Sequence, residues 1–162
     1  MDDLAFVEAD AIAWSVNARL QPITPLLRRL ERAGGPELAA QMRTSEPLAV
    51  GSAIVTGAGA LNAELLISAV VSSDSEPVTR ESVRRATLSA LQRAADWQVA
   101  QLACAPFGLG AGNLDIEESA EVMLEVMTRQ AGRAAHPGGI TIVVESASEE
   151  EAFSSRLARG AP

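Results

Sequence analysis

A glycine-rich segment, residues 104–115, is the part of the sequence best suited to hold a ligand. It reads Cys-Ala-Pro-Phe-Gly-Leu-Gly-Ala-Gly-Asn-Leu-Asp, with glycines at alternate positions. Glycine allows a backbone with positive φ and lets amide N–H groups come close to a ligand. An apolar run precedes the segment and a periodic helical pattern follows it, so unpaired amides at a helix start lie next to the loop. This order of strand, loop and helix predicts a site for phosphate or diphosphate.

The glycine spacing does not by itself identify the ligand. It matches neither the Gly-x-x-x-x-Gly-Lys-Ser/Thr pattern of P-loops nor the full Gly-x-Gly-x-x-Gly fingerprint of dinucleotide-binding folds. A loop that only turns the chain is the alternative interpretation, and the local sequence leaves both open.

The sequence offers little for conventional catalysis. It has a single histidine, His136, beside Pro137 in a predicted turn, and a single cysteine, Cys104, in a predicted strand. We therefore expect no histidine triad, no disulfide within the chain and no cysteine-based zinc site. The carboxylates of residues 117, 118, 121 and 149–151 fall at helix starts or on surface faces, where they favour the helix dipole. The sequence thus assigns no catalytic residue, no metal site and no cofactor.

Residues near the end of the N-terminal strand are further candidates for ligand contact. Asn17 directly follows the predicted strand 10–16, and its amide can bond to sugar hydroxyls or phosphate. A turn-stabilising role for the same asparagine is the alternative. Trp14 lies inside the strand, which is more typical of a core residue than of a ligand platform.

Strand and helix patterns alternate along the chain and must position these residues. Strands are predicted at residues 10–16, 51–57, 64–71, 98–105 and 140–144, with a further short strand or strand remnant at 4–8. Helices are predicted at residues 25–33, 37–42, 79–96, 116–131 and 148–157. The alternation predicts one α/β domain over residues 1–162, with a mixed, mostly parallel sheet, helices on both faces and ligands at the strand ends.

Two helix starts are marked by capping residues. Thr24 is a predicted N-cap with Pro25 at the first helical position, and Thr79 fits the start of a capping box. The arginines at positions 80, 84, 85 and 93 are interpreted as a solvated helix face.

Net charge limits the classes of partner. Lys plus Arg total 13 against 21 for Asp plus Glu, which gives a formal charge of −8. Such a charge opposes nonspecific attraction to nucleic acid, although one small anion can still bind to backbone amides. The start of the sequence lacks the pattern of a signal peptide and no apolar segment is long enough to span a bilayer, so we expect a cytoplasmic location without membrane attachment.

Several segments of the sequence, taken in chain order, resemble motifs of the macro domain family. The family's opening motifs Gly-Asp-Ile-Thr, Asp-Ala-Ile-Val and Asn-Ala-Ala-Asn are similar to Asp3-Leu4, to residues 10–13 and to residues 14–17, at the same spacing. Residues 32–38 and 51–56 resemble the family's Arg-Ala-Ala-Gly-Pro-x-Leu and Gly-x-Ala-x-x-Thr segments, and Gly108-Leu109-Gly110 its second phosphate loop. The resemblance covers nearly the whole chain and implies a three-layer α/β/α sandwich that binds ADP-ribose.

The resemblance also implies roles for individual residues. Asp3 would accept a hydrogen bond from the adenine amino group, the Leu4 amide would meet an adenine ring nitrogen, and Asn17 would bind the distal ribose. The second phosphate loop would surround the diphosphate and distal ribose through the amides of Gly108, Leu109, Gly110, Ala111 and Gly112. The helix start near Thr24 would face a phosphate.

Departures from the family pattern bear on hydrolysis. Trp14 replaces the first asparagine of Asn-Ala-Ala-Asn, and Ile23-Thr24-Pro25-Leu26 replaces a Gly-Gly-Gly-Val loop. Pro25 has no amide donor and restricts close backbone approach. The resemblance therefore implies a binding module for ADP-ribose, a related nucleotide or an ADP-ribosylated protein, without efficient hydrolysis. A divergent ADP-ribosyl or ADP-ribose-ester hydrolase and a degenerate scaffold that binds a protein partner are the alternatives.

Overall fold

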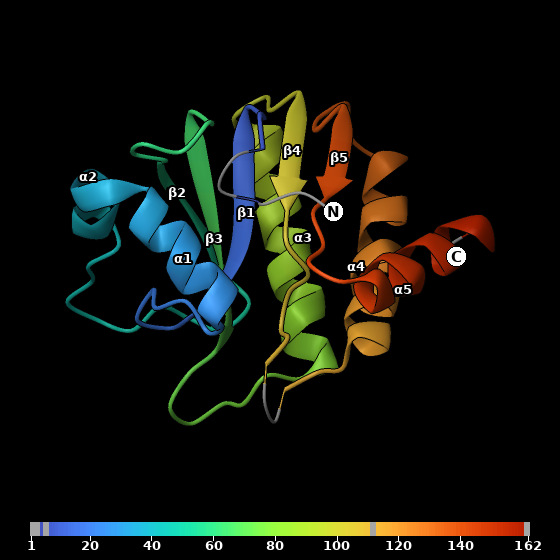
Figure 1. Cartoon of the computed structure of the whole chain (residues 1–162), viewed down its shortest axis with the longest axis horizontal. Helices are drawn as coiled ribbons and strands as arrows, with labels where there is room; N and C mark the ends of the chain where they lie inside the picture. Colours follow the sequence, from blue (N-terminus) through green and yellow to red (C-terminus); the bar gives the residue numbers. More distant parts are fainter. Residues whose placement is uncertain (1–3, 5–6, 111–112, 161–162) are drawn as a thin grey trace.

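The protein is described by a computed structural model over residues 4, 7–110 and 113–160. One sheet runs in the order β2-β3-β1-β4-β5 (Figure 1). Its strands are β1 (Ala11–Asn17), β2 (Ala53–Gly57), β3 (Leu65–Ser72), β4 (Gln101–Cys104) and β5 (Gly139–Ile142). Among these strands β2 alone is antiparallel to its neighbour, because the other pairs are joined by helical crossovers that return the chain to the same edge.

Helices cover both faces of the sheet (Figure 1). The core on one face contains α1 (Pro25–Ala33) and α2 (Gly35–Gln41), while the core on the other contains α3 (Arg80–Asp96) and α4 (Ile116–Ala131). The last helix, α5 (Ala147–Ala158), packs against α4. The predicted α/β fold, with three layers and a mixed, mostly parallel sheet, is confirmed.

Alternation along β1 divides the two cores. Because successive side chains of a strand point to opposite faces, Trp14 points toward the α1 and α2 side and Ala13 toward the α3 side. Trp14 is fully buried, and its Nε1 donates a hydrogen bond to Ser68 Oγ at 2.7 Å. The tryptophan is therefore a core residue, as its place inside the strand indicates, and its one polar atom is satisfied.

Capping explains where the helices begin. Thr24 Oγ1 accepts from Leu27 N at the start of α1, with Pro25 in the first turn, as predicted. Thr79 starts α3 in a capping box whose other member is Ser82. Asp115 and Glu118 form a second capping box at the start of α4. These starts agree with the sequence patterns because capping depends on residues only three positions apart.

Other boundaries differ from the sequence-based expectation. The strand expected at residues 4–8 is wrong for the described residues: Leu4 has 3₁₀ conformation, and Val7 and Glu8 have no strand structure. The last strand ends at Ile142, two residues before the predicted end, although Val143 and Val144 remain buried. Apolar periodicity follows burial, so it extends beyond the residues that form the ladder.

The arginines of α3 do more than face solvent. Arg80 Nη2 lies 3.1 Å from Glu121 of α4, and Arg84 Nη2 lies 3.7 Å from Glu125 of the same helix. The hydrogen bond from Arg80 holds the pKa of Glu121 below its usual value. The interpretation as a purely solvated face is thus incomplete, because a pattern within one helix does not reveal the carboxylates that another helix places beside it.

Candidate functional site

Connecting segments gather at the carboxyl ends of β1, β3, β4 and β5, at the lower side of the view in Figure 1. We call residues 18–24 the β1 loop, and residues 105–110 with 113–114 the β4 loop. In sheets of this kind ligands bind outside the carboxyl ends of the strands. The cavities at this end of the sheet are therefore the candidate sites.

One cavity, here called the loop cleft, lies between the start of α1, the β4 loop and the start of α5. Its volume is about 200 Å³. Its lining residues are Thr24, Pro25, Leu26, Leu27, Arg29, Ala105, Pro106, Leu109, Glu145 and Glu149. The structure thus brings two of the predicted ligand residues, Thr24 and Leu109, to opposite sides of one cleft.

Two residues that line the loop cleft, one on each side, have backbone amides without a partner among the described residues. In the first turn of α1, Leu27 N donates to Thr24 Oγ1 and Arg28 N to Thr24 O, while Pro25 has no N–H. The Leu26 amide is left without a partner among the described residues, and so is the amide of Leu109 in the β4 loop. Amides of this kind, one at a positive helix end, suit an anionic oxygen.

Glycines allow the β4 loop to pack closely on its surroundings. Gly108 has φ +77 and is buried, and its amide donates to Ser15 Oγ at 3.4 Å. Gly110 has φ +132 and is exposed, and a Cβ there would lie 3.7 Å from the carbonyl oxygen of Ile23. The β4 loop therefore lies directly against the β1 loop at Gly110.

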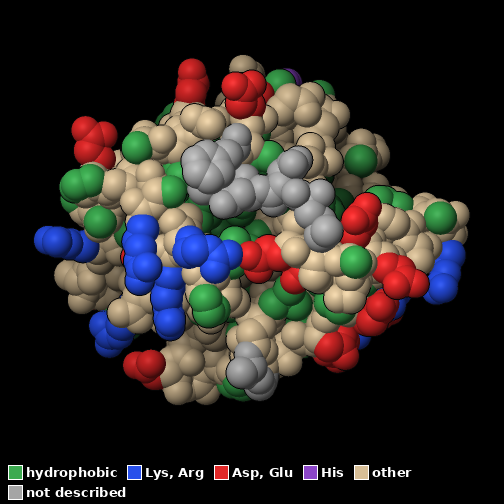
Figure 2. Space-filling view, viewed as in Figure 1, with side chains coloured by type: hydrophobic (Ala, Val, Ile, Leu, Met, Phe, Trp, Pro, Cys, Tyr) green, Lys and Arg blue, Asp and Glu red, His purple; other side chains and the backbone are tan. Residues whose placement is uncertain are grey.

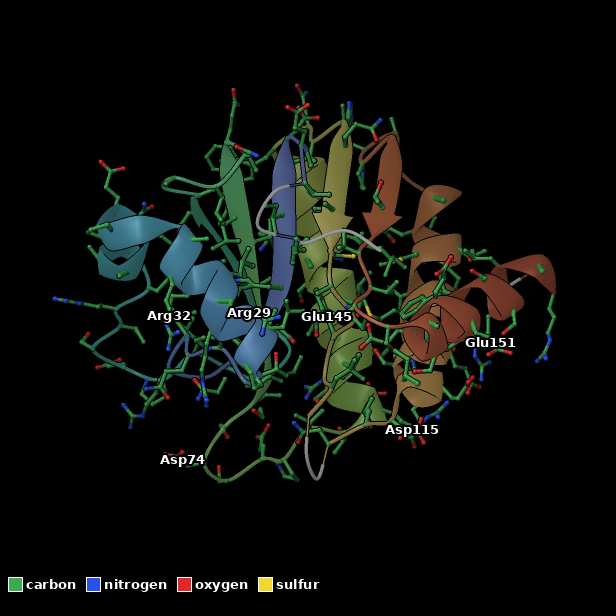
Figure 3. All side chains as sticks on the ribbon, in the orientation of Figure 1. Arg29, Arg32, Asp74, Asp115, Glu145 and Glu151 are labelled. Atoms are coloured by element: carbon green, nitrogen blue, oxygen red, sulfur yellow. The ribbon has the colours of Figure 1, made fainter. Side chains whose placement is uncertain are left out.

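Charged side chains of both signs line the loop cleft. Arg29 Nη2 lies 2.6 Å from Glu145 Oε1, and Glu149 Oε2 accepts a hydrogen bond from the Glu145 amide at 2.7 Å. Figure 3 shows Arg29 on α1 and Glu145 before α5 side by side. Blue side chains gather over α1 in Figure 2 and red ones over α5, so the cleft divides a basic from an acidic surface.

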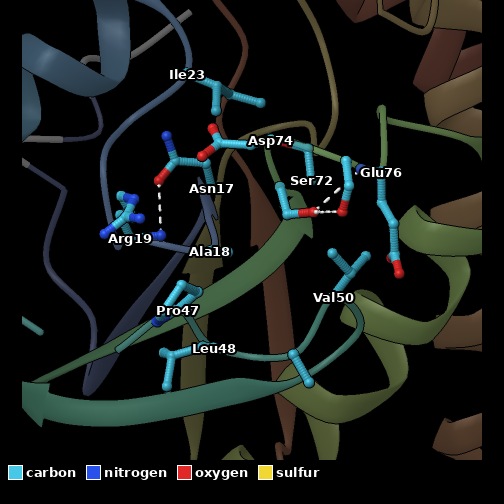
Figure 4. A pocket seen from close by; sticks show the side chains of 13 residues that line it. Asn17, Ala18, Arg19, Ile23, Pro47, Leu48, Val50, Ser72, Asp74 and Glu76 are labelled. Atoms are coloured by element: carbon cyan, nitrogen blue, oxygen red, sulfur yellow. Dashed lines mark hydrogen bonds between the residues drawn. The ribbon is translucent and has the colours of Figure 1, made fainter. Parts of the chain in front are cut away.

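A second cavity, here called the Asn17 cavity, has Ile23 in its lining. It has a volume of about 360 Å³ and is shown in Figure 4. It is bounded by the end of β1, the segment before β2 and the segment after β3. Its lining residues are Asn17, Ala18, Arg19, Ile23, Pro47, Leu48, Ala49, Val50, Ser72, Ser73, Asp74, Ser75 and Glu76.

The side chain of Asn17 is hydrogen-bonded to the β1 loop. Its Oδ1 accepts hydrogen bonds from the amides of Arg19 and Gln21, at 2.9 and 3.0 Å, and its Nδ2 donates to Gln21 Oε1. This is the turn-stabilising arrangement that asparagine favours after a strand. Asn17 thus lines a different cavity from Leu109 of the β4 loop, and the binding of one ligand by Asn17 and the glycines together stays a prediction.

The remaining predicted residues divide into two groups. Leu4 is buried in the core on the α1 and α2 side and is not among the residues that line the loop cleft. Asp3, Ala111 and Gly112 lie outside the described residues. Contacts between any of these residues and a ligand stay a prediction.

Sequence reasoning missed Arg29, Glu145 and Glu149. Arg29 and Glu145 are 116 positions apart, so only the fold brings them together. The one available signal was the position of Glu145 directly after the last apolar run, at a strand end where ligands bind in α/β sheets.

Cys104 and the metal-ligand types among the described residues were two further candidates for chemistry. Burial raises the pKa of the Cys104 thiol to about 12, so the thiolate that would act as a nucleophile is not formed at neutral pH. Within residues 4, 7–110 and 113–160, no three His, Cys, Asp or Glu side chains are grouped to hold a metal ion. None of the described helices combines the length and the apolar character needed to cross a membrane.

Residues 15–123 match the family model described as Macro domain. An uncharacterized protein of Mycobacterium tuberculosis is 29% identical over 161 residues, which cover 98% of this chain and 44% of that protein. The chain thus spans less than half the length of this relative. An uncharacterized protein of Aquifex aeolicus is 32% identical over 121 residues, 74% of this chain and 73% of the relative.

Solved structures show the same fold at low identity. The Oceanobacillus iheyensis macrodomain with MES bound superposes with a TM-score of 0.86 at 17% identity, covering 98% of this chain and 88% of that one. A glycine-to-valine mutant of that macrodomain with ADPR has a TM-score of 0.85 at 18% identity, covering 98% of this chain and 89% of the other.

Proposed function

Because the chain belongs to the Macro domain family, we propose that it is a binding module for ADP-ribose or a related nucleoside diphosphate, without efficient hydrolase activity. Structures of the Oceanobacillus iheyensis macrodomain hold ADP or ADPR, and one of the Trypanosoma brucei macrodomain holds ADP. These ligands belong to those proteins and give the chemical class for this one: a nucleoside that carries a diphosphate.

The observation that carries the proposal is that two residues lining the loop cleft have amides without a partner among the described residues. The Leu26 amide belongs to the start of α1, and the Leu109 amide belongs to the β4 loop on the opposite side. A buried or half-buried amide without a partner is costly unless a ligand or water satisfies it. A diphosphate between the two sides would accept a hydrogen bond from each.

The size of the cleft bears on how the ligand enters. Drug-sized ligands occupy pockets of roughly 300–1,000 Å³, and the loop cleft has only about 200 Å³. A diphosphate with part of its ribose fills this volume. We propose that the adenine extends beyond the cleft toward Asp3 and Leu4, as the resemblance implies.

The hydrogen bonds that Asn17 makes within the β1 loop support binding without efficient turnover. A hydrolase of the alternative kind would use the Asn17 amide to position the ribose and its attacking water. That amide makes three hydrogen bonds within the β1 loop and lines the other cavity. An ADP-ribosylated protein as partner and a cytoplasmic location remain parts of the proposal.

A matched pair of variants tests whether the unpaired Leu26 amide binds the ligand. Leu26→Ala and Leu26→Pro both remove the leucine side chain, but only proline removes the amide. Proline is tolerated in the first turn of a helix, where no helical hydrogen bond is lost, but it also disfavours the helical conformation of Pro25 before it, so thermal unfolding of both variants is measured beside the titration. Calorimetric titration with ADP-ribose, with AMP and ADP beside it, is expected to show saturable binding for the wild type and Leu26→Ala, and binding about 10-fold weaker for Leu26→Pro.

Two results would contradict the proposal. A folded wild-type sample that gives no saturable signal at millimolar ADP-ribose, ADP or AMP refutes nucleotide binding itself. Equal affinities for the alanine and proline variants, at equal thermal stability, refute the role of the Leu26 amide.

A further inference from the structure

Arg29 is the basic residue among those that line the loop cleft, and it is paired with an acidic one. Its guanidinium Nη2 lies 2.6 Å from Glu145 Oε1. The pair joins α1 to the segment between β5 and α5, so it connects the two sides of the cleft (Figure 3). A ligand that fills the cleft must contact one or both of these side chains, because both belong to its lining.

The charges around the cleft pose a problem for an anionic ligand. Glu149 also lines the cleft, and its Oε2 accepts from the Glu145 amide at 2.7 Å. Two carboxylates against one guanidinium leave the described lining with a net negative charge. While Glu145 holds Arg29, a diphosphate would meet repulsion from the carboxylates without the full attraction of the arginine.

The pair is well suited to exchange partners. The side chains of Arg29 and Glu145 are 57% and 44% exposed, and an exposed ion pair contributes little to stability. Arginine presents a planar set of donors that matches phosphate in bidentate geometry as well as it matches carboxylate. A diphosphate carries more charge than the Glu145 carboxylate, so it competes favourably for the same guanidinium.

We propose that Arg29 is a diphosphate-binding residue and that Glu145 competes with the ligand for it. This inference rests on the proposed function and deepens it. When the ligand enters, the guanidinium turns from Glu145 to the phosphate oxygens, and the contact between the two sides of the cleft opens. The exchange selects ligands with a charged diphosphate, because a neutral nucleoside supplies nothing to replace Glu145.

The same helix provides a matched control. Arg28 is exposed and adjacent in sequence, has no ion pair among the described residues and is absent from the cleft lining. Replacing either arginine by glutamine changes the net charge of the protein by the same amount. A difference between Arg28→Gln and Arg29→Gln is therefore a property of the site and not of the overall field.

The test is calorimetric titration with ADP-ribose of the wild type, Arg28→Gln, Arg29→Gln, Glu145→Gln and the double variant Arg29→Gln/Glu145→Gln. Arg29→Gln is expected to bind about 5-fold more weakly than Arg28→Gln, and Glu145→Gln about 3-fold more tightly than the wild type. When Arg29 is already glutamine, the gain in ADP-ribose affinity from Glu145→Gln is expected to be less than half of the gain seen in the wild type, because no guanidinium remains to be released.

Three outcomes decide the matter. Equal affinities for Arg28→Gln and Arg29→Gln, with saturable wild-type binding, overturn the inference and leave the proposed function intact. An undiminished gain from Glu145→Gln without Arg29 also overturns it, since Glu145 would then act by repulsion alone. Absence of saturable binding in every protein, with thermal unfolding showing that all are folded, overturns the inference and the proposed function together.

Discussion

The β1 loop and the β4 loop frame the same cleft but turn the chain by different means. In the β1 loop, side chains satisfy the backbone: Asn17 accepts from two amides of the loop, and Thr24 caps α1. Leu20 adopts φ +62 although it is not glycine, and it is held there by burial and by a hydrogen bond from its amide to Asn17 O. The loop is thus fixed by side-chain contacts.

The β4 loop owes its turns to glycine, although side chains also bond to its backbone: Ser15 Oγ accepts from the Gly108 amide and Asn113 Nδ2 donates to Leu109 O. Its turns are made by Gly108 and Gly110, both with positive φ, and the Leu109 amide between them is left unpaired among the described residues. Together the loops show how a cleft can combine a loop fixed by an asparagine with a loop turned by glycines, while one lining residue on each side, Leu26 or Leu109, keeps an amide unpaired in the described part of the chain. If this contrast is correct, substitutions in the two loops must differ both in the kind of interaction they disturb and in the size of the stability loss.

The largest effect is expected at Gly108. A Cβ there would lie 2.5 Å from Val83 Cγ2 and 3.0 Å from Val78 Cγ1, in a backbone with φ +77. The left-handed backbone and the overpacking together are expected to make Gly108→Ala about 2–4 kcal/mol less stable, as measured by chemical denaturation.

A second glycine provides the comparison for this prediction. Gly132 ends α4 in a right-handed conformation with φ −81, and the nearest atom to an added Cβ is Arg129 O at 3.7 Å. Gly132→Ala is therefore expected to change stability by less than about 1 kcal/mol. Equal losses at the two positions would mean that the β4 loop has no special need for glycine.

The sequence predicts the fold well because the fold depends on local signals. Apolar periodicity located α4 at its observed bounds, and Thr24 with Pro25 marked the start of α1. The alternation of strands and helices then limited the topology to a sheet covered on both faces. Glycines at alternate positions after a strand indicated a loop, and Gly108 and Gly110 do have positive φ, while the use of this loop as a phosphate site stays a prediction.

Contacts between distant segments could not be predicted in the same way. Asn17 and the β4 loop follow adjacent strands, which suggested one site, but Asn17 and Leu109 line two different cavities. The pairing of Arg29 with Glu145 depends on how α1 lies across the sheet relative to the segment after β5. A position along one helix carries no information about the charge that faces it from elsewhere in the chain.

The next largest effect is expected at Asn17. Asn17→Ala removes the acceptor shared by the amides of Arg19 and Gln21 and is expected to cost about 1–2 kcal/mol of stability. Asn17→Asp keeps this acceptor and loses only the donor to Gln21, so it should recover most of the stability in chemical denaturation. ADP-ribose affinity of the folded variants sharpens the contrast: a structural asparagine predicts that Asn17→Asp binds as the wild type does. Strong loss of affinity in the stable aspartate variant would instead place the side chain in contact with the ligand.

The smallest effect on stability is expected at Thr24, which both caps α1 and lines the loop cleft. Thr24→Ala removes the cap of α1 and is expected to cost about 1 kcal/mol, while Thr24→Ser keeps the hydroxyl and should cost much less. In Thr24→Ala the amide of Leu27 also loses its partner and joins the unpaired amide of Leu26 in the cleft lining. A stability loss without a loss of ADP-ribose affinity is therefore expected, since an additional donor becomes available to the ligand. A different result is that ADP-ribose affinity falls together with stability in Thr24→Ala and recovers in Thr24→Ser. The position of α1 would then matter more to the ligand than the number of free amides, and the contrast between the two loops would have to be abandoned.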